Sequence, residues 1–131
     1  ELDLPDDAPA VLADREAIPL GEERSLVVRS SVQMAGRGDR RHLGAAVDRR
    51  LRAHADAVDA PLAYFAEDTF PEAWQLVGSY RETGAGLNFE GWLEREVGGT
   101  VEDHRIEAEA ADVDSLAAAI ADRIEGHLRT L

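Results

Sequence analysis

Apolar and polar side chains alternate from residue 25 to residue 34, and this is the first strong pattern along the chain. Side chains at every second position of an extended chain point to the same side, and β-branched residues such as Val27 and Val32 favour strands. We therefore predict a strand over residues 25–34. A turn follows at residues 35–38, where two glycines flank Arg37.

Two later stretches show the spacing of an amphipathic helix. The first follows this turn, where Asp39 is well placed to cap a helix over residues 40–58. Its apolar positions are Leu43, Val47, Leu51 and Val58. The second follows Asp114, which we expect to cap it, and its apolar positions recur every four residues at Leu116, Ile120, Ile124 and Leu128. Both patterns predict helices with one buried face.

Three further stretches have the pattern of strands. They span residues 62–66, 74–80 and 101–111, and each combines alternation with strand-forming residues. A turn around Pro71 separates the first two, so we predict that residues 74–80 pair back on residues 62–66. In the third stretch, Ile106 takes one face and Glu107 takes the other.

Residues 88–97 fit both kinds of element. The set that suits a strand is Leu87, Phe89, Gly91 and Leu93, and the set that suits a helix is Phe89, Trp92, Leu93 and Val97. The charged run at residues 94–96 and the double glycine after it favour a helix slightly, with Asn88 as its cap. We predict a helix here and keep the strand as the alternative.

The order of elements defines an α+β protein. We expect a small antiparallel or mixed sheet with the two main helices on one face, and a ferredoxin-like plan is one arrangement of this kind. Residues 25–131 have the length of a single domain. Residues 1–24 form an acidic, proline-containing arm or lead-in, with eight acidic residues against two arginines.

The chain is strongly acidic and contains no lysine. The chain has 27 acidic residues, 14 arginines and no lysine, and its net charge is −13. A surface of this kind is typical of a salt-accumulating halophile, and the lack of lysine together with a single asparagine, Asn88, also fits a GC-rich genome. Net charge of this size governs solubility and association rather than fold.

Several function classes are excluded or disfavoured by composition. Cysteine is absent, which removes disulfides, thiolate metal ligands and cysteine nucleophiles. No apolar run approaches the ~20 residues of a membrane span and no signal peptide is visible, so we expect no membrane contact and a cytoplasmic location. The four histidines lack metal-binding spacing, and a strand would turn His104 away from Asp103 and Glu107. We expect no metal and no cofactor.

The basic residues are concentrated around the first predicted helix. Residues 37–54 carry a local charge of +4, and the rest of the chain carries −17. Cations in a first helical turn oppose the helix macrodipole, so Arg40 and Arg41 do not serve helix formation. Glycines, arginines and free N–H groups at a helix start can form an anion site. The candidate phosphate-binding residues are Arg37, Gly38, Arg40, Arg41 and His42.

A structural role for these arginines competes with the phosphate site and is favoured. They would then balance the acidic arm or the acidic last strand. The Gly36–Asp39 turn lacks the lysine of a P-loop and the third glycine of a dinucleotide fingerprint. Nucleic-acid binding is disfavoured too, because it normally needs a broad basic surface.

The sequence contains no visible catalytic constellation, and it leaves open whether the protein is an enzyme. A serine-hydrolase elbow is missing, and carboxylates are too frequent to be informative. The aromatic residues between positions 74 and 92 are interpreted as core members rather than as a ligand pocket. We expect a non-enzymatic interaction or assembly module that pairs with itself or with a protein partner. The alternative is a phosphate- or nucleotide-binding protein that uses the Gly36–Asp39 turn and the arginines after it.

Overall fold

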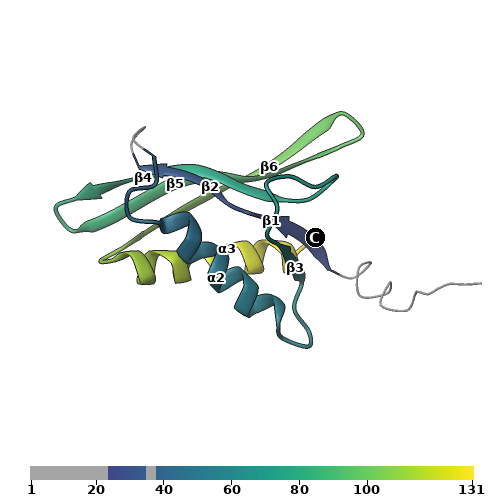
Figure 1. The fold of residues 1–131 in the computed structure, drawn as a ribbon, viewed down its shortest axis with the longest axis horizontal. Helices are drawn as coiled ribbons and strands as arrows, with labels where there is room; N and C mark the ends of the chain where they lie inside the picture. The colour runs from purple at the N-terminus through teal and green to yellow at the C-terminus, as the bar shows by residue number, and fades with distance from the viewer. Residues whose placement is uncertain (1–23, 35–37) are drawn as a thin grey trace, which may run out of the picture.

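The computed structural model describes residues 24–34 and 38–131. The predicted acidic arm therefore lies outside the described residues, except for Arg24, whose guanidinium donates hydrogen bonds to the carbonyls of Ala55 and Ala57. Figure 1 shows the elements, which are β1 (Ser25–Val28), β2 (Ser31–Met34), α2 (Leu43–Ala55), β3 (Leu62–Phe65), β4 (Gln75–Thr83), β5 (Gly86–Val97), β6 (Thr100–Ala110) and α3 (Val113–Arg129).

The strands form two sheets, one of four strands and one of two, that meet at a bend between β1 and β2. β2 pairs in parallel with β4, and β4, β5 and β6 then follow one another as an antiparallel meander. β1 pairs in parallel with β3, and a bridge between Val27 and Trp74 joins this pair to the larger sheet. The predicted strand over residues 25–34 is thus confirmed, but as two strands, because the chain changes partners at residues 29 and 30.

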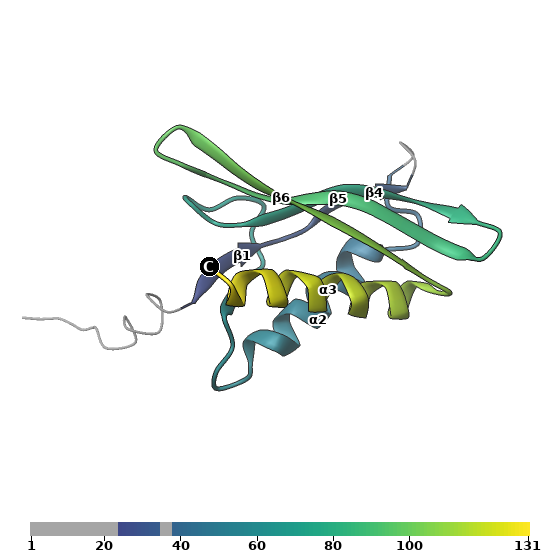
Figure 2. The ribbon, with the colours of Figure 1, turned by 180° about the vertical axis from the view of Figure 1, so that it is seen from behind.

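Both helices lie on one side of this sheet, as the two opposite views show (Figures 1 and 2). Within residues 24–34 and 38–131, no helix covers the other side, which we call the outer face. The α+β class is confirmed, with a mixed sheet. A ferredoxin-like plan is not confirmed: in that plan the second helix precedes the last strand, whereas α3 follows β6.

The predicted pairing of residues 74–80 with residues 62–66 is wrong. β3 pairs with β1, and β4 lies on the other side of β1 and β2. The connection between β3 and β4 therefore crosses over β1. The Arg29 N–H donates to the carbonyl of Glu67, and the Gln75 side chain donates to the carbonyl of Asp68. These bonds hold the crossover loop, residues 66–73, against the sheet.

The helix predicted over residues 88–97 is also wrong, because this segment is the long strand β5. Its alternating residues Leu87, Phe89 and Leu93 are buried beneath the helices. Trp92, which a helix would have buried, is 43% exposed on the outer face. Gly98 and Gly99 both have positive φ, 59° and 83°, so the double glycine forms the tight β5–β6 hairpin turn rather than a helix stop.

The two predicted helices are confirmed with different limits. α2 spans residues 43–55 rather than 40–58, and α3 begins at Val113. Asp112 is the N-cap of α3 in place of the predicted Asp114, and its carboxylate accepts the Ser115 N–H at 2.8 Å. That hydrogen bond lowers the pKa of Asp112. The residues at four-residue spacing in α3 are buried, as predicted.

The core lies between the helices and the sheet. Three of the four clustered aromatic residues are core members, as interpreted, and Trp92 is the exception. The fully buried aromatic residues are Trp74, Tyr80 and Phe89. Burial of aromatic rings supplies a large share of the hydrophobic free energy in a domain of this size.

Asp48 is the one buried charged residue among the described residues, and it holds the bend between β1 and β2. Its carboxylate accepts the Ser30 hydroxyl at 2.6 Å and the Ser30 N–H at 3.1 Å. The N–H needs this acceptor because the strand changes partners here and offers it no ladder bond. Tyr64 lies beside the same carboxylate, and burial together with this negative charge raises the pKa of Tyr64 to about 12.

Replacing Asp48 by Ala should destabilise the protein by about 1–2 kcal/mol, because the half-buried Ser30 N–H and hydroxyl then lose their acceptor. Asp48→Asn keeps one acceptor oxygen and should cost less. Chemical denaturation followed by circular dichroism measures both. Asp56→Ala, at an exposed position just after α2, is the matched control and should change the unfolding free energy by less than about 0.5 kcal/mol. Equal effects of the two alanine variants would contradict this role of Asp48.

Two glycines face each other across the centre of the sheet. Gly78 of β4 and Gly91 of β5 are register partners, and the Phe89 ring lies over both. A Cβ on Gly91 would lie 2.3 Å from the carbonyl oxygen of Val77 and 2.7 Å from the Phe89 ring. No side chain fits there, so this pair sets how closely the Phe89 ring approaches the sheet.

Gly91→Ala should therefore destabilise the fold by about 3 kcal/mol, since both close contacts are with fixed groups of the sheet. Gly84→Ala is the control, because nothing lies within 4 Å of a Cβ at that position. Thermal unfolding of the two variants gives the comparison. A Gly91→Ala melting temperature equal to that of the control would show that the sheet adjusts freely around this pair.

Candidate functional site

The predicted phosphate site lies at the turn before α2. Arg37 is outside the described residues, whereas Gly38, Arg40, Arg41 and His42 are all exposed. The Arg41 side chain forms an ion pair with Glu82 of β4. The backbone N–H of Arg41 donates a hydrogen bond to the Tyr80 hydroxyl at 2.9 Å. Arg40 has no ion-pair partner among the described residues. The structure thus gathers the four described candidates on one turn but engages Arg41 within the protein.

Asp39 occupies the helix start that an anion would need. Its carboxylate accepts the N–H groups of Leu43 and Gly44, each at 2.7 Å, so it caps α2 as predicted. The residue at the N-cap position itself is His42, in the left-handed conformation with φ 58°. Asp39 also accepts the Tyr80 hydroxyl at 2.6 Å, and burial, followed by this hydrogen bond, raises the pKa of Tyr80. The protein's own carboxylate is therefore the anion at this helix N-terminus.

The outer face of the sheet is left uncovered by the described helices, and it is acidic. Residues of alternating positions on β4, β5 and β6 project from it. Its charged members are Arg81, Glu90, Glu94, Glu96, Asp103, Arg105, Glu107 and Glu109. Arg105 lies over the exposed Trp92 ring, 5.3 Å from its centroid, and pairs with Glu90 and Glu107.

Carboxylates stand directly opposite each other at two places on this face. Glu90 is the register partner of Glu107, and Glu94 is the register partner of Asp103. Like charges in direct cross-strand pairs are destabilising. Arg105 relieves the first pair, but no ion pair relieves the second within the described part of the chain. The end of the sheet near Glu94 therefore has uncompensated negative charge.

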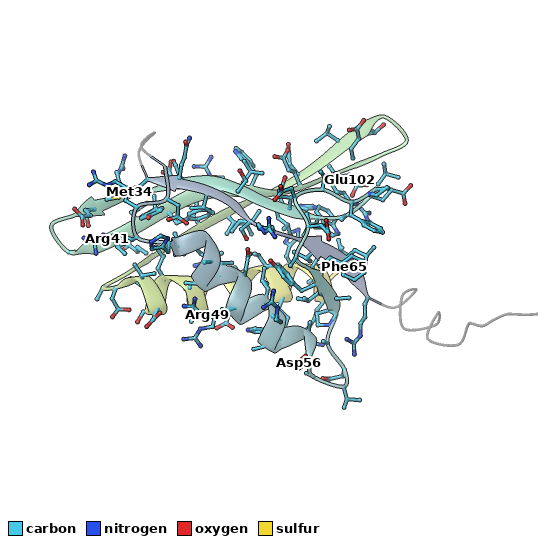
Figure 3. All side chains as sticks on the ribbon, viewed as in Figure 1. Met34, Arg41, Arg49, Asp56, Phe65 and Glu102 are labelled. Atoms are coloured by element: carbon cyan, nitrogen blue, oxygen red, sulfur yellow. The ribbon has the colours of Figure 1, made fainter. Side chains whose placement is uncertain are left out.

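A groove of about 510 Å³ lies at this same end, between the crossover loop and the β5–β6 hairpin. Its apolar lining includes Val28, Phe70, Pro71 and Val101. Its acidic lining consists of Asp68, Glu72, Glu94 and Glu96. We call it the acidic groove. Figure 3 shows Glu102, on the hairpin, and Arg41, beside α2, at opposite ends of the sheet.

Sequence reasoning did not find this groove. It treated the carboxylates of residues 67–68 and 94–96 as uninformative, because acidic residues are frequent throughout the chain. The groove exists only because the crossover loop passes over the sheet, and that path follows from the pairing of β3 with β1. Reading residues 86–97 as a strand would have placed Glu94 and Glu96 on one face together with Trp92, but not beside the crossover loop.

Two histidines stack inside the fold where α3 meets the sheet. The rings of His104 on β6 and His127 on α3 are 3.9 Å apart between centroids, and Trp74 lies 5.4 Å from His104. Arg95, paired with Glu102, covers the Trp74 ring. Burial, and then the proximity of His104, lowers the pKa of His127. Both effects favour the neutral imidazole of His127. Among the described residues, no carboxylate or hydroxyl hydrogen-bonds to either ring.

The histidine pair predicts how stability depends on pH. Because the pKa of His127 is lower in the folded than in the unfolded protein, the unfolded chain binds more protons as the pH falls below about 6.5. The unfolding free energy should therefore decrease on acidification, and His127→Phe should flatten this part of the profile. Chemical denaturation at a series of pH values gives the difference between the two proteins. Identical pH profiles would show that His127 does not titrate differently on folding.

The described residues contain no group of three or more His, Cys, Asp or Glu side chains arranged to hold a metal ion. His104 points inward while Asp103 and Glu107 are exposed on the outer face, as the strand pattern predicted. His54 of α2 is engaged by Glu125 and Asp122 of α3, which ties the two helices together. None of the described helices has the length and apolar character needed to cross a bilayer.

Comparisons of the chain with family models, with curated proteins and with solved structures found no match.

Proposed function

We propose that this protein is a non-enzymatic interaction module that associates head to tail. In this association the acidic groove of one copy binds Arg49 and Arg50, on α2 of the next copy. The observation that carries the proposal is that the Glu94–Asp103 pair has no compensating cation and lies beside the acidic groove, whose lining is partly apolar. A cation from a partner would remove a repulsion that the isolated chain retains.

The complementary surface is on the helix layer. Arg49 and Arg50 of α2 are exposed and have no ion-pair partner among the described residues. Figure 3 shows Arg49 on the side of the molecule away from the outer face. Because the two surfaces are different and lie on opposite layers, their contact is heterologous and can repeat from copy to copy.

The apolar lining of the acidic groove adds hydrophobic contact area to the charge complementarity of the proposed interface. Phe70 is 42% exposed and stacks edge-on against Phe65, which is 38% exposed, with ring centroids 5.2 Å apart. Aromatic residues are enriched where protein surfaces meet, because they bury much area at low cost in conformational entropy. Arginine is enriched there too and stacks on such rings.

Charge reversal on each surface tests the proposal. Wild-type protein should show a mass above one chain by light scattering, rising with protein concentration and falling in concentrated KCl, where the Debye length is ~3 Å. Arg49→Glu/Arg50→Glu and Glu94→Arg should each weaken association by about tenfold or more. A mixture of the two variants should associate again into dimers or larger species, since each retains the surface that the other has lost.

Glu109→Arg is the matched control. It reverses a charge on the same face but at the other end of β6, where Glu109 accepts a hydrogen bond from Asn88. Association of this variant should equal that of the wild type. A monomeric wild-type protein at all concentrations, or no association in the mixture, would refute head-to-tail assembly.

The phosphate-binding alternative has weaker support, because the Asp39 carboxylate occupies the N–H groups at the start of α2. A cytoplasmic setting is part of our proposal and rests on the sequence alone.

A further inference from the structure

The last strand of the larger sheet leaves one side without a partner. The strand order is β2–β4–β5–β6, so β6 has β5 on one side and, within residues 24–34 and 38–131, no strand on the other. Edge strands are normally short or covered, because their unpaired backbone groups attract other strands. β6 is eleven residues long, and we call its free side the β6 edge. It offers a further strand a long row of hydrogen-bonding groups.

Gly98 and Gly99, the two-residue turn between β5 and β6, decide which residues direct backbone groups to the β6 edge. Such a turn is closed by a hydrogen bond between its flanking residues, so Thr100 directs its N–H to β5. The register with β5 is continuous along the whole of β6, so the alternation of backbone direction is unbroken. The residues that direct N–H and C=O to the β6 edge are therefore Val101, Asp103, Arg105, Glu107 and Glu109. Among the described residues, no loop or side chain forms a hydrogen bond with these backbone groups.

A hollow of about 310 Å³ passes around the middle of this edge. Its lining includes Glu107 and Glu109 of the outer face and also Ala119 and Arg123 of α3. Because α3 lies beneath β6, on the other side of the sheet (Figure 2), a space that touches both sets runs past the backbone of β6. Paired strands lie about 4.8 Å apart, so an added strand occupies this space.

Acidic side chains outnumber basic ones around the hollow. Glu90, Glu107 and Glu109 line it, and Arg123 is the cation in its lining. Arg105, the arginine of β6 itself, is already paired with Glu107. A second copy of the chain presents the same carboxylates and is repelled, since like charges on paired strands are destabilising. A strand with lysine or arginine side chains is attracted instead.

We infer that the β6 edge binds an extended basic segment of a partner protein by strand addition. The backbone of the segment pairs with Asp103, Arg105 and Glu107. Its lysine or arginine side chains lie on the outer face beside Glu107 and Glu109, and its alternate, small apolar side chains lie over Ala119. In recognition of this kind the backbone bonds supply affinity and the alternate side chains supply specificity.

This inference goes beyond head-to-tail association and does not depend on it. The hollow at the β6 edge shares no lining residue with the acidic groove, and its lining contains neither Arg49 nor Arg50. The two surfaces can therefore be altered separately.

The probe is a fluorescein-labelled peptide of alternating lysine and valine, about seven residues long, which at ~3.3 Å per residue covers residues 103–109. A peptide of the same composition with consecutive lysines keeps the charge and loses the alternation. A glutamate–valine peptide reverses the charge. Fluorescence anisotropy measures the affinity of each peptide.

Glu107→Pro is the main variant, because it removes an N–H at the hollow without breaking a bond to β5. Glu107→Gln removes the same charge and keeps the N–H. Val101→Pro removes an outward N–H beside the hairpin turn, outside the segment that the peptide covers. Circular dichroism checks that each variant is folded.

We expect the alternating peptide to bind wild type and Val101→Pro equally, and Glu107→Gln about threefold more weakly. Glu107→Pro should bind it at least tenfold more weakly than Glu107→Gln. The two control peptides should bind wild type at least tenfold more weakly than the alternating peptide. Equal affinity for the alternating and consecutive peptides, or equal affinity of the two Glu107 variants, would show attraction to an acidic surface without strand pairing and would overturn the inference.

Amide exchange followed by NMR tests the pairing in the wild-type protein itself. In the free protein the N–H groups of Asp103, Arg105 and Glu107 should exchange faster than those of His104 and Ile106, which face β5. The alternating peptide should protect the first three. Slow exchange of these three groups in the free protein, or no added protection at saturating peptide, would contradict strand addition.

Light scattering separates this inference from head-to-tail association. Glu107→Pro should associate like wild type, because the acidic groove and the arginines of α2 are intact. Arg49→Glu/Arg50→Glu should bind the alternating peptide like wild type, whether or not the wild-type protein associates. If Glu107→Pro instead becomes monomeric while the peptide fails to bind wild type, the β6 edge pairs with a second copy of the chain, and its assignment to a basic segment is wrong.

Discussion

The contact between the Asp48 carboxylate and Ser30 is the constraint on which the rest of the architecture depends. A strand that changes partners leaves backbone groups without ladder bonds, and a buried N–H without an acceptor is costly. Asp48 supplies the acceptor from α2, 2.6 Å from the Ser30 hydroxyl, and so ties the first helix to the bend. Its own burial is tolerable because its oxygens are hydrogen-bonded.

The acidic groove follows from the strand order around this bend. β3 lies on one side of β1, and the segment that leads into β4 lies on the other. The connection from β3 to β4 must then cross β1, and the crossover loop forms one wall of the acidic groove. Arg29, at the bend, fixes that loop through its ion pair with Asp68 at 2.7 Å. This crossover thus determines where the acidic groove lies.

The charges are distributed in a way that costs stability in the isolated chain. Cross-strand carboxylates repel, and the Glu94–Asp103 pair has no compensating cation within the described residues. Arg49 and Arg50 on α2 have no acidic partner there either. Fold stability alone would favour pairing such groups, so their separation on opposite layers is the main physical reason to propose that this protein associates. Hydrophobic packing around Phe89 and Trp74 stabilises the fold and offsets the repulsion between these carboxylates.

Local patterns determined most of the elements. The spacing of apolar residues predicted both helices and the strands over residues 25–34 and 101–111, because one buried face imposes the period of the element on the sequence. The same rule failed at residues 88–97, where Phe89 and Leu93 satisfy both periods, and only pairing with β4 and β6 selects the strand. Strand order, the crossover loop and the acidic groove were decided by tertiary structure, since they depend on which backbone groups meet across long sequence separations. Arg40 and Arg41 illustrate the difference: their clustering is visible in the sequence, but only the folded chain shows Asp39 at the helix start and Glu82 beside Arg41.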